Sequence, residues 1–181
     1  MDDKDLLLQQ FNTLRGEIKA TKTRIFWIVA LGLFGVPLIT FLAESREQAE
    51  FVTPMIPYVV IVLIVMFIAE HTALMRAGQY IRCNIEPRSN ETLGWETWLE
   101  GHPGVRLLDK HFFAVFVLVF FVYYFMSIGF AVRTLWLAGA EEPSRMWWSI
   151  AAGVTYVIGL FWTLSTLLHH WRSATGTSFE E

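Results

Sequence analysis

The sequence predicts an all-α integral membrane protein with four transmembrane helices per protomer, both termini in the cytoplasm and a cytoplasmic helical collar. Hydrophobic residues make up 54% of the 181 residues, and charged residues only 17%. Four runs contain no Asp, Glu, Lys or Arg, and each has about the ~20 residues that a helix needs to cross a bilayer. These runs are residues 25–43, 51–69, 112–132 and 146–168.

The positions of Lys and Arg predict the orientation, because loops rich in these residues stay in the cytoplasm. All of the 14 Lys and Arg residues except Arg46, Arg133 and Arg145 fall on the side of the N-terminus, the second loop and the C-terminal tail. We therefore expect a multi-pass protein of the bacterial cytoplasmic (inner) membrane, with the lipid bilayer as its first partner.

Residues 1–24 form a predicted cytoplasmic amphipathic helix, because Leu7, Phe11, Leu14 and Ile18 recur at spacings of three and four. This stripe can lie on lipid headgroups or pack against the helix that leaves the second span, and we favour packing. Transmembrane helices 1 and 2 follow over residues 25–69. Gly32, Gly35 and Pro37 predict a kink or a close helix contact in the first of them.

The second span leads into charged sequence while helical spacing continues through Leu74, Ala77, Ile81 and Ile85. One helix over residues 58–85 would reach ~42 Å at ~1.5 Å per residue, whereas a hydrocarbon core is ~30 Å thick. We therefore predict a rigid rod that leaves the membrane and ends before Pro87. Residues 70–111 form this cytoplasmic helical extension and a loop.

The loop carries aromatic residues that a solvated linker would not need, and we expect it to fold back onto the rod or a neighbouring subunit. Arginine and aromatic side chains together can hold phosphates or bases, although ion pairs with Glu86, Glu91 or Glu96 are the simpler alternative. The predicted cytoplasmic regulatory or ligand-binding residues are Arg76, Tyr80, Arg82, Arg88, Trp95, Glu96 and Trp98.

Transmembrane helices 3 and 4 are predicted over residues 112–168, followed by a cytoplasmic tail over residues 169–181. The fourth helix carries a stripe of small and hydroxyl residues that either packs against another helix or lines a narrow pore in an oligomer. The stripe consists of Ala151, Thr155, Gly159, Thr163 and Thr166. The outer loops contain acidic residues that form an acidic mouth in an oligomer, or solvated loop charges in a monomer. These residues are Glu44, Glu47, Glu50, Glu141 and Glu142.

The sequence gives little support for catalysis, so we expect no enzyme, no cofactor and no metal site. No predicted span contains an ionisable Asp, Glu, Lys or Arg, which also disfavours a coupled transporter. The serines of the spans, Ser127, Ser149 and Ser165, have no catalytic partner in sequence. His169 and His170 are adjacent, so they point about 100° apart on a helix and do not form a metal-binding pair.

Residues 70–100 resemble a family of small prokaryotic four-span membrane proteins. The likeness consists of the pattern R-x-x-x-Y-I-R-x-x-I-E-P, from Arg76 to Pro87, followed by G-W-E-x-W-L, from Gly94 to Leu99. The overall layout is also similar to that of membrane effectors of anti-phage systems, such as the Hailong effector. That second likeness implies a homo-oligomer, a tetramer-like ring, toxicity when open, and control by a partner nucleotidyltransferase or its nucleotide or oligonucleotide product.

From these features we expect a homo-oligomeric membrane channel or pore, an ion-conducting effector in anti-phage defence that is gated through its cytoplasmic collar. The alternative is a membrane scaffold or sensor that conducts no ions and recruits a soluble cytoplasmic partner through the loop with Trp95 and Trp98.

Overall fold

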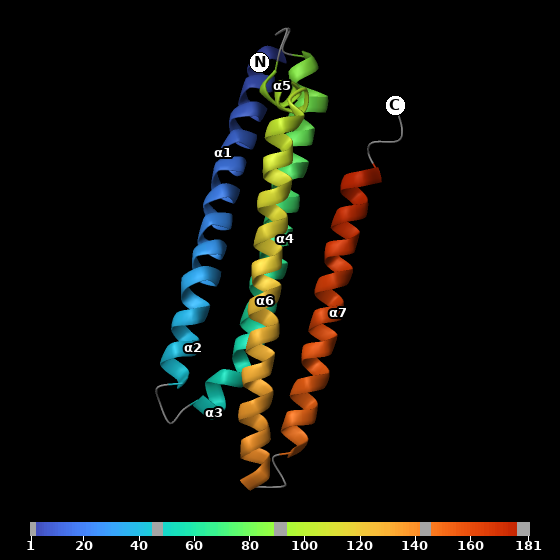
Figure 1. Cartoon of the computed structure of the whole chain (residues 1–181). Coiled ribbons are helices and arrows are strands. Elements are labelled where there is room, and N and C mark those ends of the chain that lie inside the picture. The colour runs from blue at the N-terminus through green and yellow to red at the C-terminus, as the bar shows by residue number, and fades with distance from the viewer. Residues whose placement is uncertain (1–2, 45–48, 89–93, 142–145, 177–181) are drawn as a thin grey trace. The chain divides into compact units, whose positions relative to one another are not determined.

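The computed structural model of the chain describes residues 3–44, 49–88, 94–141 and 146–176 (Figure 1). Within these ranges, the side chains of some residues lie outside the description. They are residues 3–4, 44, 49–50, 100, 103–110, 141 and 170–176.

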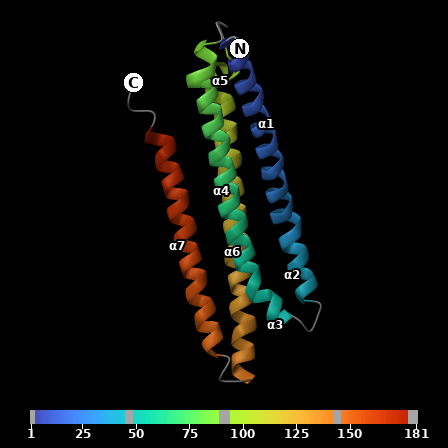
Figure 2. The same ribbon diagram turned by 180° about the vertical axis from the view of Figure 1, so that it is seen from behind.

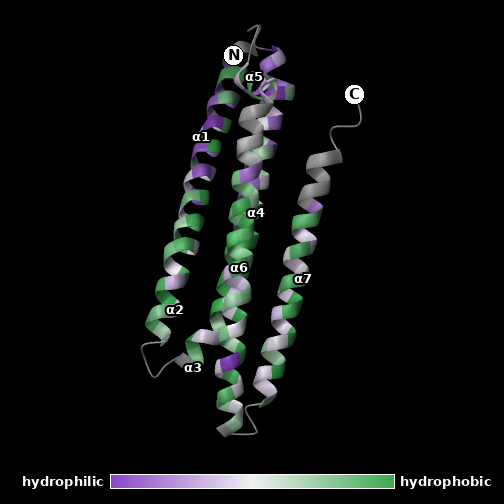
Figure 3. Cartoon of the chain, in the orientation of Figure 1, coloured by the Kyte–Doolittle hydropathy of each residue, from purple (hydrophilic) through white to green (hydrophobic). Residues whose placement is uncertain are grey.

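The described residues are helical almost throughout and contain no strand, so the prediction of an all-α chain is confirmed. Among the described residues, four helical segments are long and apolar enough to cross a membrane, as the four charge-free runs predict. Figure 3 shows the change along α1 (Asp3–Ala30), which mixes hydrophilic and hydrophobic residues over most of its length and is hydrophobic only toward its C-terminal end, after Arg24.

The remaining elements follow in chain order, and Figure 2 shows them from behind. They are η1 (Leu31–Gly35), α2 (Val36–Glu44), α3 (Ala49–Val52), η2 (Thr53–Met55), α4 (Ile56–Tyr80), η3 (Ile81–Ile85), η4 (Glu86–Arg88), α5 (Trp95–Glu100), α6 (Pro103–Glu141) and α7 (Met146–Gly176).

Three helices extend further than the sequence suggested. The N-terminal amphipathic segment and the start of the first span form one continuous helix, α1. Helix α6 begins at Pro103, nine residues before the predicted third span, and proline is favoured at the first position of a helix because its missing N–H would be unpaired there anyway. Helix α7 continues through Gly176, into the predicted tail.

The predicted rod differs in its last turns. Its α-helical part ends at Tyr80, and a π-helical segment, η3, follows with a hydrogen bond from the Glu86 N–H to the Ile81 carbonyl. The same arrangement occurs in η1, where the Val36 N–H binds the Leu31 carbonyl. Each π segment ends two residues before a proline, Pro37 or Pro87. Because a proline ring clashes with the carbonyl four residues earlier, the wider turn relieves a strain that a regular α-helix would have.

The chain divides into two compact units. Unit 1 consists of Met1–Trp27 and Ala69–Phe116, and unit 2 of Ile28–Ile68 and Val117–Glu181. Helices α1, α4 and α6 each contribute residues to both units.

In unit 2 the most deeply buried large side chains come from α4, α6 and α7, and α1 and α2 add Ile28, Val36 and Ala43 to the core. Val60, Ile64, Phe120, Tyr124 and Tyr156 are all buried. Gly32 lies against the ring of Phe120, so this glycine of the first span provides the close helix contact that the sequence predicts, whereas a Cβ on Gly35 would meet only Leu31 of its own helical stretch.

In unit 1 the stripe Leu7, Phe11, Leu14 and Ile18 of α1 is half-buried, and Ile81 and Ile85 are buried. Tyr80 of α4 lines a groove together with residues of α1. These observations favour packing of the amphipathic stripe within the protein.

Candidate functional site

The first feature of unit 1 is a carboxylate that holds the start of helix α5. Glu86 Oε1 accepts a hydrogen bond from the Glu96 N–H at 2.7 Å, and Glu86 Oε2 accepts from the Thr97 N–H at 2.9 Å. The Thr97 hydroxyl donates to Glu86 Oε2 at 2.6 Å. The first N–H groups of a helix have no partner within it, and a negative charge there is favourable. We call this set of three hydrogen bonds the Glu86 clamp.

Gly94 makes the clamp possible. It precedes α5 with an extended backbone, at φ −76° and ψ 154°. A Cβ atom built on Gly94 would lie 2.0 to 2.4 Å from the carboxylate atoms of Glu86. Any other residue at this position would displace the carboxylate from the N–H groups of α5.

The clamp also changes the acidity of two carboxyl groups that lie outside the predicted spans. Partial burial would raise the pKa of Glu86, but the hydrogen bonds from Thr97 and Glu96, together with the charge of Arg15, lower it overall. Burial raises the pKa of Glu96, and the neighbouring Glu86 charge raises it further, while Arg15 and Lys22 oppose this shift. The surroundings therefore stabilise the negative charge of Glu86 and destabilise the negative charge of Glu96.

Helix α5 meets the end of α4 at a glycine. A Cβ on Gly78 would lie 3.3 Å from Glu96 Oε2, so the missing side chain leaves room for the carboxylate. Glu96 is half-buried at this place. Gly78 thus allows close contact between α5 and the helix that begins in unit 2 at Ile56.

The outer side of α5 is aromatic. The rings of Trp95 and Trp98 stack with their centroids 5.3 Å apart, and Trp98 stacks on His102 at 4.2 Å. Trp95 is 55% exposed and Trp98 37% exposed. An exposed stack of this kind is a surface on which a partner protein or a planar ligand can pack.

The predicted regulatory residues do not all lie in one place. Trp95, Glu96 and Trp98 share the short helix α5. Arg76 and Arg88 have exposed side chains on α4 and η4, and Arg82 is half-buried in η3. Tyr80 is exposed and lines the groove beside α1. Of the predicted regulatory residues, only Trp95, Glu96 and Trp98 therefore lie together on one short helix.

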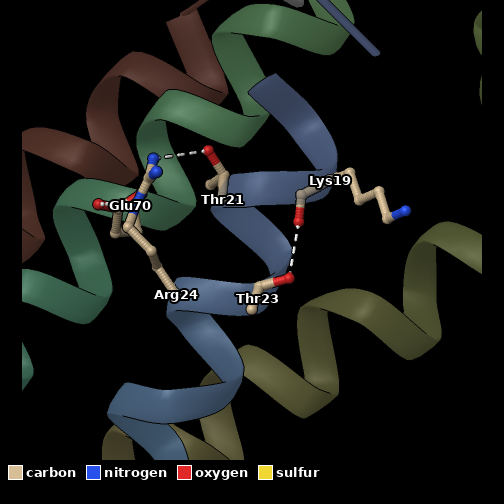
Figure 4. A network of polar contacts seen from close by, with 5 residues as sticks. All are labelled: Lys19, Thr21, Thr23, Arg24 and Glu70. Carbon is tan, nitrogen blue, oxygen red and sulfur yellow. Dashed lines mark hydrogen bonds and ion pairs between the residues drawn. The ribbon is translucent and has the colours of Figure 1, made fainter. Parts of the chain in front are cut away.

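Sequence reasoning missed an ion pair between α1 and α4 in unit 1. Arg24 Nε donates to Glu70 Oε1 at 2.8 Å, and a second guanidinium nitrogen donates to the Thr21 hydroxyl at 3.0 Å (Figure 4). The other carboxylate oxygen, Glu70 Oε2, is buried and has no hydrogen-bond partner among the described residues. Arg24 directly precedes the first charge-free run and Glu70 directly follows the second, so in antiparallel spans they fall at the same depth. That signal was present in the sequence.

In unit 2 the small and hydroxyl stripe of α7 contributes to packing within the protomer. A Cβ on Gly159 would lie 2.3 Å from Cδ1 of Ile61, so α4 and α7 approach closely there. Thr163 is buried and donates to the Gly159 carbonyl at 2.8 Å. The Thr155 hydroxyl is hydrogen-bonded to the Tyr58 hydroxyl of α4.

The two ends of the stripe differ from its centre. Ala151 is exposed, and Thr166 is half-buried with its hydroxyl bound to the carbonyl four residues earlier. Every described threonine of the stripe donates to a backbone carbonyl of α7 itself. Such bonds allow a hydroxyl residue in an apolar helix without a water partner.

Two tyrosines connect three helical segments of unit 2. The Tyr124 hydroxyl of α6 donates to the Tyr156 carbonyl of α7 at 2.6 Å. The Tyr156 hydroxyl donates to the Pro54 carbonyl of η2 at 2.7 Å. The 3₁₀ partner of this carbonyl would be residue 57, a proline without an N–H, so the tyrosine supplies a donor that the backbone lacks.

The acidic mouth and possible metal ligands complete the set of sites considered from the sequence. The residues of the acidic mouth, Glu44, Glu47, Glu50, Glu141 and Glu142, lie outside the described side chains. In the part of the chain that the structure describes, no group of three or more His, Cys, Asp or Glu could hold a metal ion.

Comparison of the chain with family models, with curated proteins and with solved structures found no match. The resemblance to four-span membrane proteins therefore stays a prediction.

Proposed function

We propose that the protein is a homo-oligomeric membrane channel whose opening is controlled by its cytoplasmic part. The observation that carries this proposal is the connection between helix α5 and helix α4. The Glu86 clamp and the Gly78 contact attach α5 to the end of a helix whose first half, from Ile56, belongs to the apolar unit 2. A ligand or partner that moves α5 would act on this helix.

The surface of α7 supports an oligomer. Its most apolar stretch is the least buried of the four candidate spans, at 11%. A Cβ on Gly153 would meet no described atom within 4 Å, so no helix in the described part of the chain requires a glycine at this position. Small residues on a membrane helix allow the backbone of another helix to approach closely, and a second copy of α7 or α6 fits this role.

The proposed site of action is the bacterial inner membrane. In that setting the ring would hold several copies, four in the architecture that the sequence resembles, with the acidic outer residues near its mouth. Opening would dissipate ion gradients and harm the cell, which agrees with an effector of antiviral defence.

The experiment is electrical recording from planar bilayers that contain the purified protein, after light scattering has established its oligomeric mass. We expect discrete current steps from the wild-type oligomer. The matched variant Gly153→Leu should elute as a smaller species and conduct no current. Silent bilayers from verified wild-type oligomers would contradict the proposal.

A second candidate is a scaffold or sensor that conducts no ions, and the exposed stack of Trp95, Trp98 and His102 favours it. Exposed aromatic residues are typical anchors of protein interfaces. Affinity capture of a cytoplasmic protein that is lost in Trp95→Ala/Trp98→Ala, together with bilayers that stay silent for the wild type, would favour this function.

A further inference from the structure

A basic groove runs along one side of helix α1 in unit 1. It is open to solvent, has a volume of about 570 Å³, and is lined by Arg15, Ile18, Lys19, Lys22, Thr23 and Phe26. The positions 15, 19, 22 and 26 are separated by four, three and four residues, so they share one face of the helix. We call this feature the α1 groove.

The α1 groove is positively charged. Its described lining contains three cationic side chains and no carboxylate. The charge of Arg15 acts on the carboxylates of Glu86 and Glu96, and that of Lys22 acts on Glu96. Lys19 extends away from α1 on the side opposite the Arg24 and Glu70 pair (Figure 4). The groove thus retains an excess of positive charge that a negatively charged group can neutralise.

The groove lies at the predicted membrane surface, so the anion that it meets there is a phospholipid headgroup. Its cationic residues precede the first charge-free run, which begins at Ile25, and its last lining residue, Phe26, lies inside that run. Phe26 and its neighbour Trp27 are 63% and 61% exposed. A helix in which cationic residues are followed by exposed aromatic residues fits the boundary between phospholipid headgroups and acyl chains.

We propose that the α1 groove binds the headgroup phosphate of an anionic phospholipid in the leaflet on the N-terminal side of the membrane. Arg15, Lys19 and Lys22 neutralise the headgroup, while Phe26, at the membrane end of the groove, contacts the start of the acyl chains. This site does not depend on whether the protein conducts ions. It would fix the depth and rotation of α1 in the bilayer.

The test titrates full-length protein in an uncharged detergent with phosphatidylglycerol and, separately, with phosphatidylcholine, and counts bound lipids by native mass spectrometry. We expect phosphatidylglycerol to bind the wild type at least about tenfold more tightly. Each removed charge should raise its apparent Kd roughly fivefold, so the variant Arg15→Gln/Lys19→Gln/Lys22→Gln should lose most of this preference. Phosphatidylcholine binding should not change.

A charge-matched control separates the groove from net charge. The variant Arg46→Gln/Arg133→Gln/Arg145→Gln removes the three cations that the sequence places on the other side of the membrane, and it should keep the wild-type Kd for phosphatidylglycerol within about twofold, because no cation of the α1 groove is removed. An equal loss in this control, or no loss in the groove variant, would overturn the proposal. Displacement of the lipid by an equal concentration of soluble glycerol phosphate would also overturn it, since the site would then bind free phosphate.

If the triple groove variant loses helical circular dichroism or a uniform elution profile, the lipid affinities of single variants at Lys19 test the proposal instead. Lys19→Gln should weaken phosphatidylglycerol binding roughly fivefold, and Lys19→Arg should retain it, because only the first removes the charge. Equal binding by the two variants would overturn the proposal.

Discussion

Replacement of Glu86 by alanine should loosen helix α5 without unfolding the protein. The substitution removes the acceptor of three hydrogen bonds, at 2.7, 2.9 and 2.6 Å from the donors in Glu96 and Thr97. Hydrogen bonds to a charged group contribute about 1.5–3 kcal/mol each, and a buried donor that is left without a partner costs about 1–3 kcal/mol. Here most of the donors are exposed and can bind water, so the loss should follow the scale of helix N-caps, about 1–2 kcal/mol.

A loss of this size raises the open population of α5 about 5- to 30-fold. Hydrogen exchange of the peptide over residues 94–102, read by mass spectrometry, measures that population directly. Exchange should accelerate by this factor in Glu86→Ala and by less in Glu86→Gln, which keeps one acceptor oxygen. The matched control Glu17→Ala removes an exposed glutamate of α1 and should leave this peptide unchanged. Unchanged exchange of the peptide in Glu86→Ala would refute the clamp.

Three more predictions concern pH and the membrane helices. Lowering the pH from 7 should first stabilise α5, because Glu96 has a raised pKa and loses an unfavourable charge above the ordinary glutamate value of 4.5. Further acidification, from 4.5 through the lowered pKa of Glu86, should destabilise α5, because Glu86 then loses the charge that holds the clamp. Exchange protection of α5, corrected for intrinsic rates, should therefore pass through a maximum, and a steady decline on acidification would contradict this. Gly159→Ala should destabilise the protein in detergent by about 1–3 kcal/mol through overpacking against α4, whereas Gly153→Ala on the same helix should be neutral or slightly stabilising. Equal shifts of the two melting curves would exclude this packing role. Tyr156→Phe should lower the unfolding free energy by about 1–3 kcal/mol, measured by denaturant titration, because the Pro54 carbonyl loses its donor.

The apolar helices could be predicted because absence of charge over about 20 residues is a signal that tertiary contacts do not alter. The start of α6 at Pro103 was also readable, since proline favours the first position of a helix, but the aromatic run further along set the predicted boundary. The ion pair of Arg24 and Glu70 could have been found by comparing the ends of antiparallel spans.

The hydrogen bonds of the Glu86 clamp could not be predicted from the helical spacing of residues in the sequence. Glu86 lies in η4, ten and eleven residues before its partners Glu96 and Thr97 in α5, so no helical spacing connects the carboxylate with its donors. The packing of Gly159 against Ile61 depends on the rotation of two helices about their axes, which a small-residue stripe leaves open. The π-helical turns follow from prolines two residues later, but proline predicts only an interruption and not its form.

Single-channel recording from bilayers tests the main proposal most directly when wild-type protein is compared with Glu86→Ala at equal oligomeric mass. The expected result is current steps of the same size in both, with a changed open probability in the variant, because the proposal makes the clamp a control element of α4 and not part of the pore lining. Wild-type bilayers that stay silent, or gating that is identical in the two proteins, would contradict control of a channel through α5.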